Sequence, residues 1–217
     1  MRGLLVAALA ALLLVAGCGG NGDAESSGDG GGGNTCEQVE NPAPREAPVL
    51  EAPSGTLDPQ KTYELLFETS CGNFTVTLDQ RLAPETTKSL VALAEEGFYD
   101  DTVFHRIVPG FVIQGGDPTA TGTGGPGYQT VDAPEPSTEY PFGTVAMAKG
   151  AADPPGTAGS QFFVVTAPDA QLPPEYAVIG RVTDGSDVVM RIGMLGDPAT
   201  EQPTQPVVIE SIEIERS

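Results

Sequence analysis

The stretch that most constrains the fold of this chain runs from Val103 to Asp117 and reads VFHRIVPGFVIQGGD. It is a dense apolar run with one strong cation, Arg106, in a chain that has 10 Lys and Arg against 30 Asp and Glu. A guanidinium among apolar residues needs partners for its hydrogen-bond donors. The central Pro109-Gly110 pair predicts a turn, so we expect two short strands on either side of it.

Strand alternation indicates which side chains this hairpin brings together. Side chains alternate between the two faces of a strand, so Phe104 and Arg106 are expected on one face. Val112 and Gln114 are expected together on one face of the second strand. A cation, an amide and large apolar groups would then converge across one turn. The hairpin alone leaves two interpretations open, a functional groove or an ordinary core hairpin with a salt-bridged arginine.

The run FHRIVPGFVIQGGD, residues 104–117, closely resembles the signature of the cyclophilin peptidyl-prolyl isomerases. Further segments are similar to the remaining blocks of that family, in its order and at near-family spacing: GTGG (122–125), VAMA (145–148), GSQFF (159–163) and AVIGRV (177–182). The resemblance covers about residues 62–217. It implies a prolyl isomerase with the fold of that family.

Residues 62–217 are predicted to form one mainly β domain without internal repeats. Strands are expected at residues 63–68, 74–78, 103–114 in two pieces, 144–148, 161–166, 177–182 and 207–215. Helices are expected at 84–97 and 187–194, and a long surface loop at 117–140. Many short strands with two helices favour a closed eight-stranded β-barrel capped by two α-helices, which is also the cyclophilin fold.

Residues 1–17 are predicted to be a signal peptide. Met1-Arg2 is a minimal positive segment, and the apolar stretch from Leu4 to Ala16 has 13 residues, too few to span a bilayer comfortably. Cys18 completes the sequence Val-Ala-Gly-Cys, which resembles a bacterial lipobox. We therefore expect an exported protein, lipidated at Cys18 and anchored to the outer face of the bacterial cell membrane. The alternative is a plain secretory signal, which also predicts export.

Residues 18–61 are predicted to be a tether without a core of its own. Residues 19–34 are mainly Gly, Ser, Asn and acidic residues and are expected to be flexible, whereas residues 40–60 are rich in Pro and Glu and are expected to be extended. The tether is either a spacer that lifts the domain off the membrane or disorder without a role. Once Cys18 is lipidated, Cys36 and Cys71 remain, and in an oxidising compartment they most simply form a disulfide. Free thiols are the alternative.

Composition and motifs argue against several classes of function. Removal of residues 1–17 takes away one charged residue, Arg2, so the formal net charge moves from −20 to −21, which repels nucleic acid and anionic head groups. No Walker motif is present, and we interpret the Gly-rich run at 122–125 as loop structure. The single His105 cannot build a histidine metal site, and the absence of a G-x-S-x-G elbow favours a packed structural histidine over a triad base. We expect no metal, no cofactor and a monomer.

Rotation about a prolyl bond needs neither a nucleophile nor a metal. The resemblance implies that Arg106 is the catalytic arginine, that Phe111 belongs to the proline pocket, and that Gln114 positions Arg106 and the substrate backbone. It also implies a substrate-binding set of Val112, Ala148, Lys149, Gln161, Phe163, Leu172 and Tyr176. Five positions depart from the residues usual in the family: Val112 in place of Met, Lys149 in place of Asn, Ala158 within the loop 156–159, Gln171 in place of Trp and Tyr176 in place of His.

These inferences converge on an exported, lipid-anchored prolyl cis–trans isomerase that acts on proline-containing peptides and unfolded exported proteins. The rival is a non-catalytic proline-peptide binding module that uses the same groove. An enzyme speeds exchange of an Ala-Pro peptide at substoichiometric amounts, whereas a binding module only shifts its populations. A purely structural envelope lipoprotein is disfavoured, because it would leave the polar groove residues unexplained.

Cys18→Ser tests the predicted anchor. We expect wild-type protein in the membrane fraction to carry a diacylglyceryl group on Cys18, and the variant to be soluble or retained as precursor, because lipid attachment needs the thiol. Mass spectrometry of the membrane fraction measures the modification. An unmodified Cys18 in mature wild-type protein would contradict the prediction.

Overall fold

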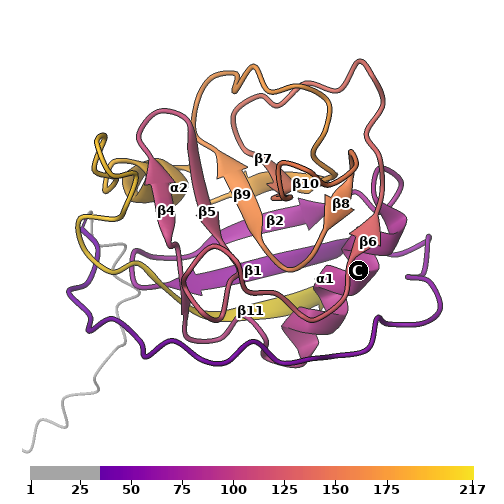
Figure 1. Cartoon of the computed structure of the whole chain (residues 1–217), viewed down its shortest axis with the longest axis horizontal. Coiled ribbons are helices and arrows are strands. Elements are labelled where there is room, and N and C mark those ends of the chain that lie inside the picture. Colours follow the sequence, from indigo (N-terminus) through magenta and orange to yellow (C-terminus); the bar gives the residue numbers. More distant parts are fainter. Residues whose placement is uncertain (1–34) are drawn as a thin grey trace, which may run out of the picture. The chain divides into compact units, whose positions relative to one another are not determined.

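The computed structural model describes residues 35–217 (Figure 1). The predicted signal peptide, Cys18 and the Gly-rich residues 19–34 lie outside the described residues. The described chain is mainly β and has two α-helices, as expected. Neither of these two helices combines the length and the hydrophobicity needed to cross a membrane.

Nine strands form one curled antiparallel sheet (Figure 1). From one edge to the other they are β3 (Thr102–Val103), β11 (Val208–Arg216), β1 (Tyr63–Thr69), β2 (Phe74–Leu78), β10 (Val178–Asp184), β7 (Thr144–Met147), β9 (Phe162–Val165), β5 (Val112–Gly115) and β4 (Arg106–Val108). A separate two-stranded sheet pairs β6 (Thr130–Val131) with β8 (Thr157–Ala158).

The expectation of a closed eight-stranded barrel is wrong. The sheet has nine strands, and its two edge strands, β3 and β4, do not pair with each other, so it forms a half-barrel. Only Phe104 and His105 separate these strands in sequence, and the chain crosses there from one edge to the other. The Phe104 amide donates to the Val207 carbonyl oxygen at 3.0 Å, and the Ile107 amide donates to that of Glu201 at 2.9 Å. The loop that carries Glu201, rather than β3, therefore covers the edge of β4.

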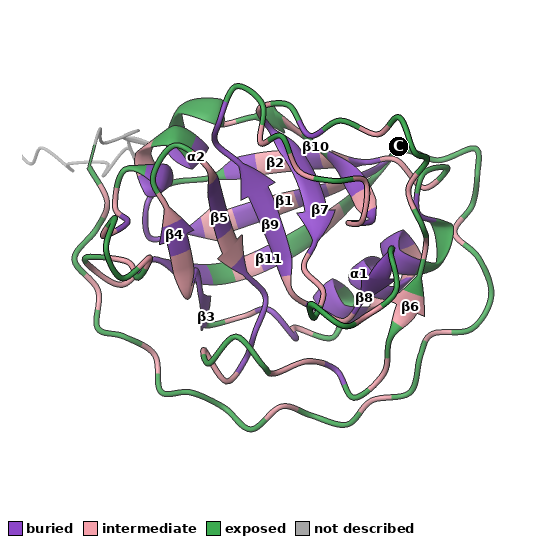
Figure 2. Cartoon of the chain, turned by 45° about the horizontal axis from the view of Figure 1, so that its top comes forward, coloured by how far each residue is buried: buried purple, intermediate pink, exposed green. Residues whose placement is uncertain are grey.

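The core lies on the inner face of the curled sheet, and alternate residues along β1 and β2 are buried (Figure 2). Leu65 of β1 lies opposite Val76 of β2, and both are fully buried. Phe67 stacks on Phe74 with ring centroids 4.5 Å apart and meets Phe162 of β9 edge-on at 5.4 Å. These aromatic contacts join strands that are nearly 100 residues apart in sequence and fix the curvature of the sheet.

The two helices lie close to their predicted positions. α1 (Pro84–Glu95) has Pro in its first turn, where a missing N–H breaks no helical hydrogen bond, and is followed by Gly97 with φ of 66°. α2 (Ser186–Gly193) buries Val188, Val189 and Ile192. It packs against β2, β4 and β5, so it supports the hairpin formed by the last two of these strands.

The N-terminal arm, defined here as residues 35–62, runs along the surface of the domain (Figure 1). A disulfide joins Cys36 to Cys71, which lies in the turn between β1 and β2. Further along the arm, the amide of Arg45 donates to the Pro118 carbonyl oxygen at 2.9 Å, and the amide of Leu50 donates to that of Pro126 at 2.8 Å. The Pro-rich segment, residues 40–60, contains no helix or strand, and it is hydrogen-bonded to the domain.

Cys36→Ser should lower the free energy of unfolding by about 3 kcal/mol, because the disulfide links residues 35 positions apart and restricts the unfolded chain. Chemical denaturation followed by circular dichroism measures this loss. Wild-type protein treated with a thiol reductant is the matched control and should lose the same amount. Unchanged denaturation midpoints in both samples would show that the bond adds nothing to stability.

Candidate active site

The β4–β5 hairpin brings Arg106 and Gln114 together, as the sequence predicts. Gly110, with φ of 67°, completes the turn after Pro109 in a backbone conformation that favours glycine. In the resulting register Arg106 lies directly opposite Gln114. Both side chains are partly exposed on one face of the sheet.

Phe104 does not share a face with Arg106, contrary to expectation. Its side chain is fully buried in the main core, whereas Arg106 is partly exposed. Phe104 and His105 lie between β3 and β4 and not within a strand, so the alternation of a strand does not extend to them.

A row of hydrogen bonds starts at Arg106 and crosses three chain segments. The Nη1 group of Arg106 lies 3.4 Å from Oε1 of Gln114, and Nε2 of Gln114 donates to Oε1 of Gln161 at 3.1 Å. Nε2 of Gln161 then donates to the Gly124 carbonyl oxygen at 3.0 Å. Each amide uses its oxygen as acceptor and its nitrogen as donor, so the row fixes the orientation of both glutamines.

Glu201 extends this row at the Arg106 end. The sequence analysis did not identify this residue. Its Oε2 accepts a hydrogen bond from Nε of Arg106 at 2.8 Å, with 35% of the Arg106 side chain and 46% of the Glu201 side chain exposed. The backbone of Glu201 is held as well, since its amide donates to the Asp197 carbonyl oxygen at 2.8 Å and its own carbonyl accepts from Ile107. The two partners are 95 residues apart, and no local motif marks an acidic residue in a loop as a partner of Arg106.

An apolar cluster lies beside this row and apart from the main core. Its buried members include Val112, Phe163 and Tyr140. The partly buried residues packed against it include Phe111, Ala148, Leu172 and Tyr176. The structure therefore brings together six of the predicted site residues, which lie in β5 and β9, in the turn before β5 and in the loops after β7 and β9: Phe111, Val112, Ala148, Phe163, Leu172 and Tyr176.

Tyr176 is the member that ties the cluster together. Its ring meets that of Phe163 edge-on at 5.4 Å and that of Tyr140 at 6.2 Å. The Tyr140 hydroxyl donates to the Tyr176 carbonyl oxygen at 2.9 Å, and the Tyr176 amide lies 3.1 Å from the same hydroxyl. Burial raises the pKa of Tyr140 above its ordinary value, so this hydroxyl stays protonated.

Lys149 offers the site no free charge. Only 4% of its side chain is exposed, and its ammonium group forms an ion pair with Glu175 at 3.0 Å. It also donates to the Asp153 carbonyl oxygen at 3.1 Å and lies 5.8 Å from the centre of the Tyr176 ring. The Lys149 ammonium group therefore holds its own loop together.

Asp117 organises the loop that follows β5, called here the Gly-rich loop (residues 116–129). Its buried carboxylate accepts hydrogen bonds from the amides of Thr119 and Gly122, both at 2.7 Å, and from that of Gly124 at 3.0 Å. Burial alone would raise the pKa of Asp117, but these hydrogen bonds, with one from the Thr119 hydroxyl, lower it below its ordinary value. Because the loop amides are occupied by this carboxylate, the loop is not a phosphate cradle, as the sequence predicts.

His105 is a packed histidine. Neither ring nitrogen is solvent-exposed or has a hydrogen-bond partner among residues 35–217. Burial lowers the pKa of His105, and the nearby Arg106 lowers it further, although Asp117 acts in the opposite direction. The ring is therefore neutral at physiological pH and forms no triad. Within the described residues, no three His, Cys, Asp or Glu side chains are grouped to hold a metal ion.

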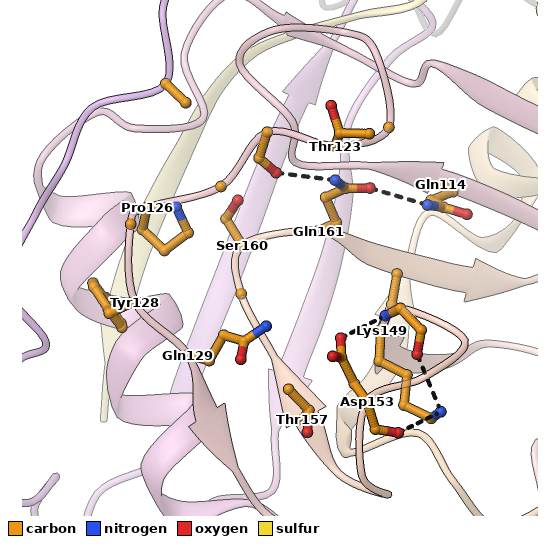
Figure 3. Close-up of a pocket in the computed structure, with 18 residues that line it drawn as sticks. Gln114, Thr123, Pro126, Tyr128, Gln129, Lys149, Asp153, Thr157, Ser160 and Gln161 are labelled. Atoms are coloured by element: carbon orange, nitrogen blue, oxygen red, sulfur yellow. Dashed lines mark hydrogen bonds between the residues drawn. The ribbon is translucent and has the colours of Figure 1, made fainter.

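A polar cavity of about 770 Å³ adjoins the apolar cluster (Figure 3). Gln114 and Gln161 lie at one side of it, and Tyr128 and Gln129 lie at the other. The Gly-rich loop, the segment from Ala148 to Asp153 and the segment before β9 complete the walls. The site thus combines three features, namely an apolar surface for a ring, a row of oriented donors and acceptors, and a polar cavity behind that row.

Comparison with known proteins agrees with this geometry. The family model described as cyclophilin type peptidyl-prolyl cis-trans isomerase matches residues 64–214. Peptidyl-prolyl cis-trans isomerase A of Mycobacterium tuberculosis is 37% identical over 185 residues, which cover 76% of this chain and 100% of that protein. Peptidyl-prolyl cis-trans isomerase-like 1 of Neurospora crassa is 39% identical over 157 residues, or 70% of this chain and 94% of that protein.

Solved structures agree as well. A crystal structure of a cyclophilin type peptidyl-prolyl cis-trans isomerase of Cryptosporidium parvum superimposes with a TM-score of 0.65 and 31% sequence identity, covering 71% of this chain and 98% of that one. A second structure of the same protein, determined in the presence of the dipeptide Ala-Pro, gives a TM-score of 0.65 with 32% identity, covering 70% of this chain and 98% of that one.

Proposed function

Because this chain belongs to the cyclophilin family and is a peptidyl-prolyl cis–trans isomerase, we propose that it accelerates X-Pro isomerisation while exported proteins fold. The observation that carries this proposal is the row from Glu201 through Arg106 and Gln114 to Gln161, placed beside an apolar cluster. The row supplies oriented hydrogen-bond donors, and the cluster supplies a surface for a proline ring.

The reaction sets the requirements for such a site. Rotation about a peptide bond is opposed by amide resonance, with a barrier of about 18–20 kcal/mol. A site lowers the barrier if it holds the ring, fixes the flanking backbone and donates a hydrogen bond to the twisted amide, whose nitrogen has regained its lone pair. Each decrease of about 1.4 kcal/mol in the barrier gives a tenfold increase in rate.

The apolar cluster is the proposed proline pocket. Phe111, Leu172 and Tyr176 are only partly buried, so they keep surface available for a ring, whereas Phe163 and Val112 form the buried floor. The Cryptosporidium parvum relative was determined in the presence of Ala-Pro, which supports a proline-containing ligand for this surface. Phe163 of this cluster lies opposite Gln114 in the pairing of β5 with β9, and Gln161 directly precedes β9.

Arg106 is the proposed donor to the twisted amide. Glu201 occupies its Nε and Gln114 faces its Nη1, while Nη2 has no hydrogen-bond partner among residues 35–217. A guanidinium held on two sides keeps its free N–H groups in a fixed direction, and preorganised donors of this kind need no rearrangement at the moment of reaction. In this scheme Glu201 is a positioning residue, because it acts through Arg106.

The proposed setting is the outer face of the bacterial cell membrane, with Cys18 as lipid anchor. The Cys36–Cys71 disulfide supports an oxidising compartment, since such bonds persist mainly in exported proteins. The second candidate is a non-catalytic proline-peptide module on the envelope. The two contacts that orient Arg106 and, within residues 35–217, leave its Nη2 group free favour catalysis, since binding of a ring alone requires no oriented cation.

Arg106→Ala should reduce kcat/KM for a proline peptide by roughly 10²–10³, the scale of losing one preorganised charged donor. The melting temperature should stay nearly unchanged, because the side chain is partly exposed. Peptide exchange spectroscopy at substoichiometric enzyme gives the rate. Arg181→Ala, on an exposed position of β10, is the matched control and should keep full activity. If Arg106→Ala kept more than about half of the activity, the assignment would fail.

Glu201→Ala should reduce kcat by about three- to tenfold with little change in KM, because the guanidinium loses its fixed orientation but the ring pocket stays intact. Glu201→Gln should recover most of the activity, since its amide oxygen still accepts from Arg106. Glu210→Ala, exposed on β11, serves as control. Equal loss in the Ala and Gln variants would mean that charge, and not orientation, is what Glu201 supplies.

A further inference from the structure

The N-terminal arm lies outside the segment that matches the cyclophilin family, yet it reaches the catalytic side of the molecule. We propose that this arm is part of the substrate-binding surface, with Ala47 forming an outer wall of the polar cavity that begins at Gln114 and Gln161. The wall would contact residues of the client polypeptide that lie beyond the prolyl bond. This inference rests on the proposed function and adds a subsite to it.

Several bonds hold the arm in place. The Cys36–Cys71 disulfide fixes its start, where the Glu37 amide also donates to the Ser70 carbonyl oxygen at 2.7 Å. Its end is fixed by Thr62, whose amide donates to the Ser217 carbonyl oxygen at 2.9 Å. A segment attached at both ends has fewer conformations to lose on ordering, so modest contacts suffice to hold its middle.

Arg45 is the main attachment in the middle of the arm. Its Nη2 group lies 2.8 Å from each of two carbonyl oxygens, those of Phe98 and Asp100, just after α1. Its backbone amide donates to Pro118 at the beginning of the Gly-rich loop. Arg45 therefore joins the arm to the segment after α1 and to the loop that walls the cavity, only two residues before Ala47.

The arm touches the cavity wall directly at Gly127. A Cβ added to Gly127 would lie 3.0 Å from Cα of Val49, and the residue has φ of 88°, so the close approach depends on glycine. The neighbouring Leu50 amide donates to Pro126 of the same loop. Any shift of the arm here must move the loop whose Gly124 carbonyl oxygen accepts from Gln161.

The cavity is suited to an uncharged polar segment of polypeptide. Its volume of about 770 Å³ is within the range of binding sites for ligands far larger than a proline ring. Tyr128 and Gln129 supply polar groups along its wall. Lys149, the one cation in its lining, is paired with Glu175, and the chain carries a net charge of −20, so an acidic segment is disfavoured.

Ala47→Trp tests the subsite. Against a peptide of about 12 residues with one central proline, long enough to extend well past the prolyl bond, we expect KM to rise about tenfold with kcat unchanged, since the lost contacts are equally present in the ground state and the transition state. Against a tetrapeptide kcat/KM should stay within about twofold. Ala52→Trp, on the same arm but exposed and outside the cavity lining, is the matched control and should leave both substrates unaffected.

A binding measurement on the full-length protein provides a second readout. Titration of ¹⁵N-labelled wild type with the longer peptide should shift the amide resonance of Ala47, whereas the tetrapeptide should leave it in place. The subsite would be overturned if Ala47→Trp raised KM equally for both peptides. It would also be overturned if the variant changed KM for neither peptide and the Ala47 resonance did not move. Both results leave the isomerase assignment standing, because that assignment depends on turnover of the tetrapeptide by wild type and its loss in Arg106→Ala.

Discussion

Glu201 covers the outer edge of β4 and also orients Arg106, the proposed donor to the twisted amide. β4 is an edge strand that has no partner on its outer side, and an unpaired edge leaves backbone amides to be satisfied. The carbonyl oxygen of Glu201 accepts a hydrogen bond from the Ile107 amide, and its carboxylate accepts one from Nε of Arg106. A half-barrel can therefore leave its edges apart and still hold a guanidinium steady there.

The strand β5 shows how core packing sets the geometry of the site. Ile113 is fully buried in the main core, whereas its neighbours Val112 and Gln114 belong to the outer face. On that face Gln114 lies opposite Phe163 of β9, which joins the polar row to the apolar cluster. Because alternate residues of one strand serve the core and the site, the hydrophobic packing that fixes Ile113 also fixes the position of Gln114.

Sequence reasoning succeeded where the determining interactions are local and failed where they are not. A turn at Gly110 is enough to predict that Arg106 faces Gln114, and two leftover cysteines are enough to suggest the bond between Cys36 and Cys71. Glu201 could not be identified as a site residue, because its partner Arg106 is 95 residues away in sequence. Glu201 lies in a loop and has φ of 59°, and such a conformation leaves no recognisable local pattern. The prediction of a closed barrel failed for the same reason, since a count of strands does not show which edge strands pair with each other.

The arm raises the question of why a largely exposed segment is ordered. Fixing the backbone of each residue costs about 1–2 kcal/mol, and the arm buries little apolar surface beyond Leu50 and Leu57, which pack against the core. Its order therefore depends on the disulfide at its start and on the Arg45 contacts in its middle. Reduction of the disulfide would release the start of the arm while Arg45 still holds its middle. The wall at Ala47 would then be weakened more than the proposed proline pocket, whose apolar cluster includes no residue of the arm.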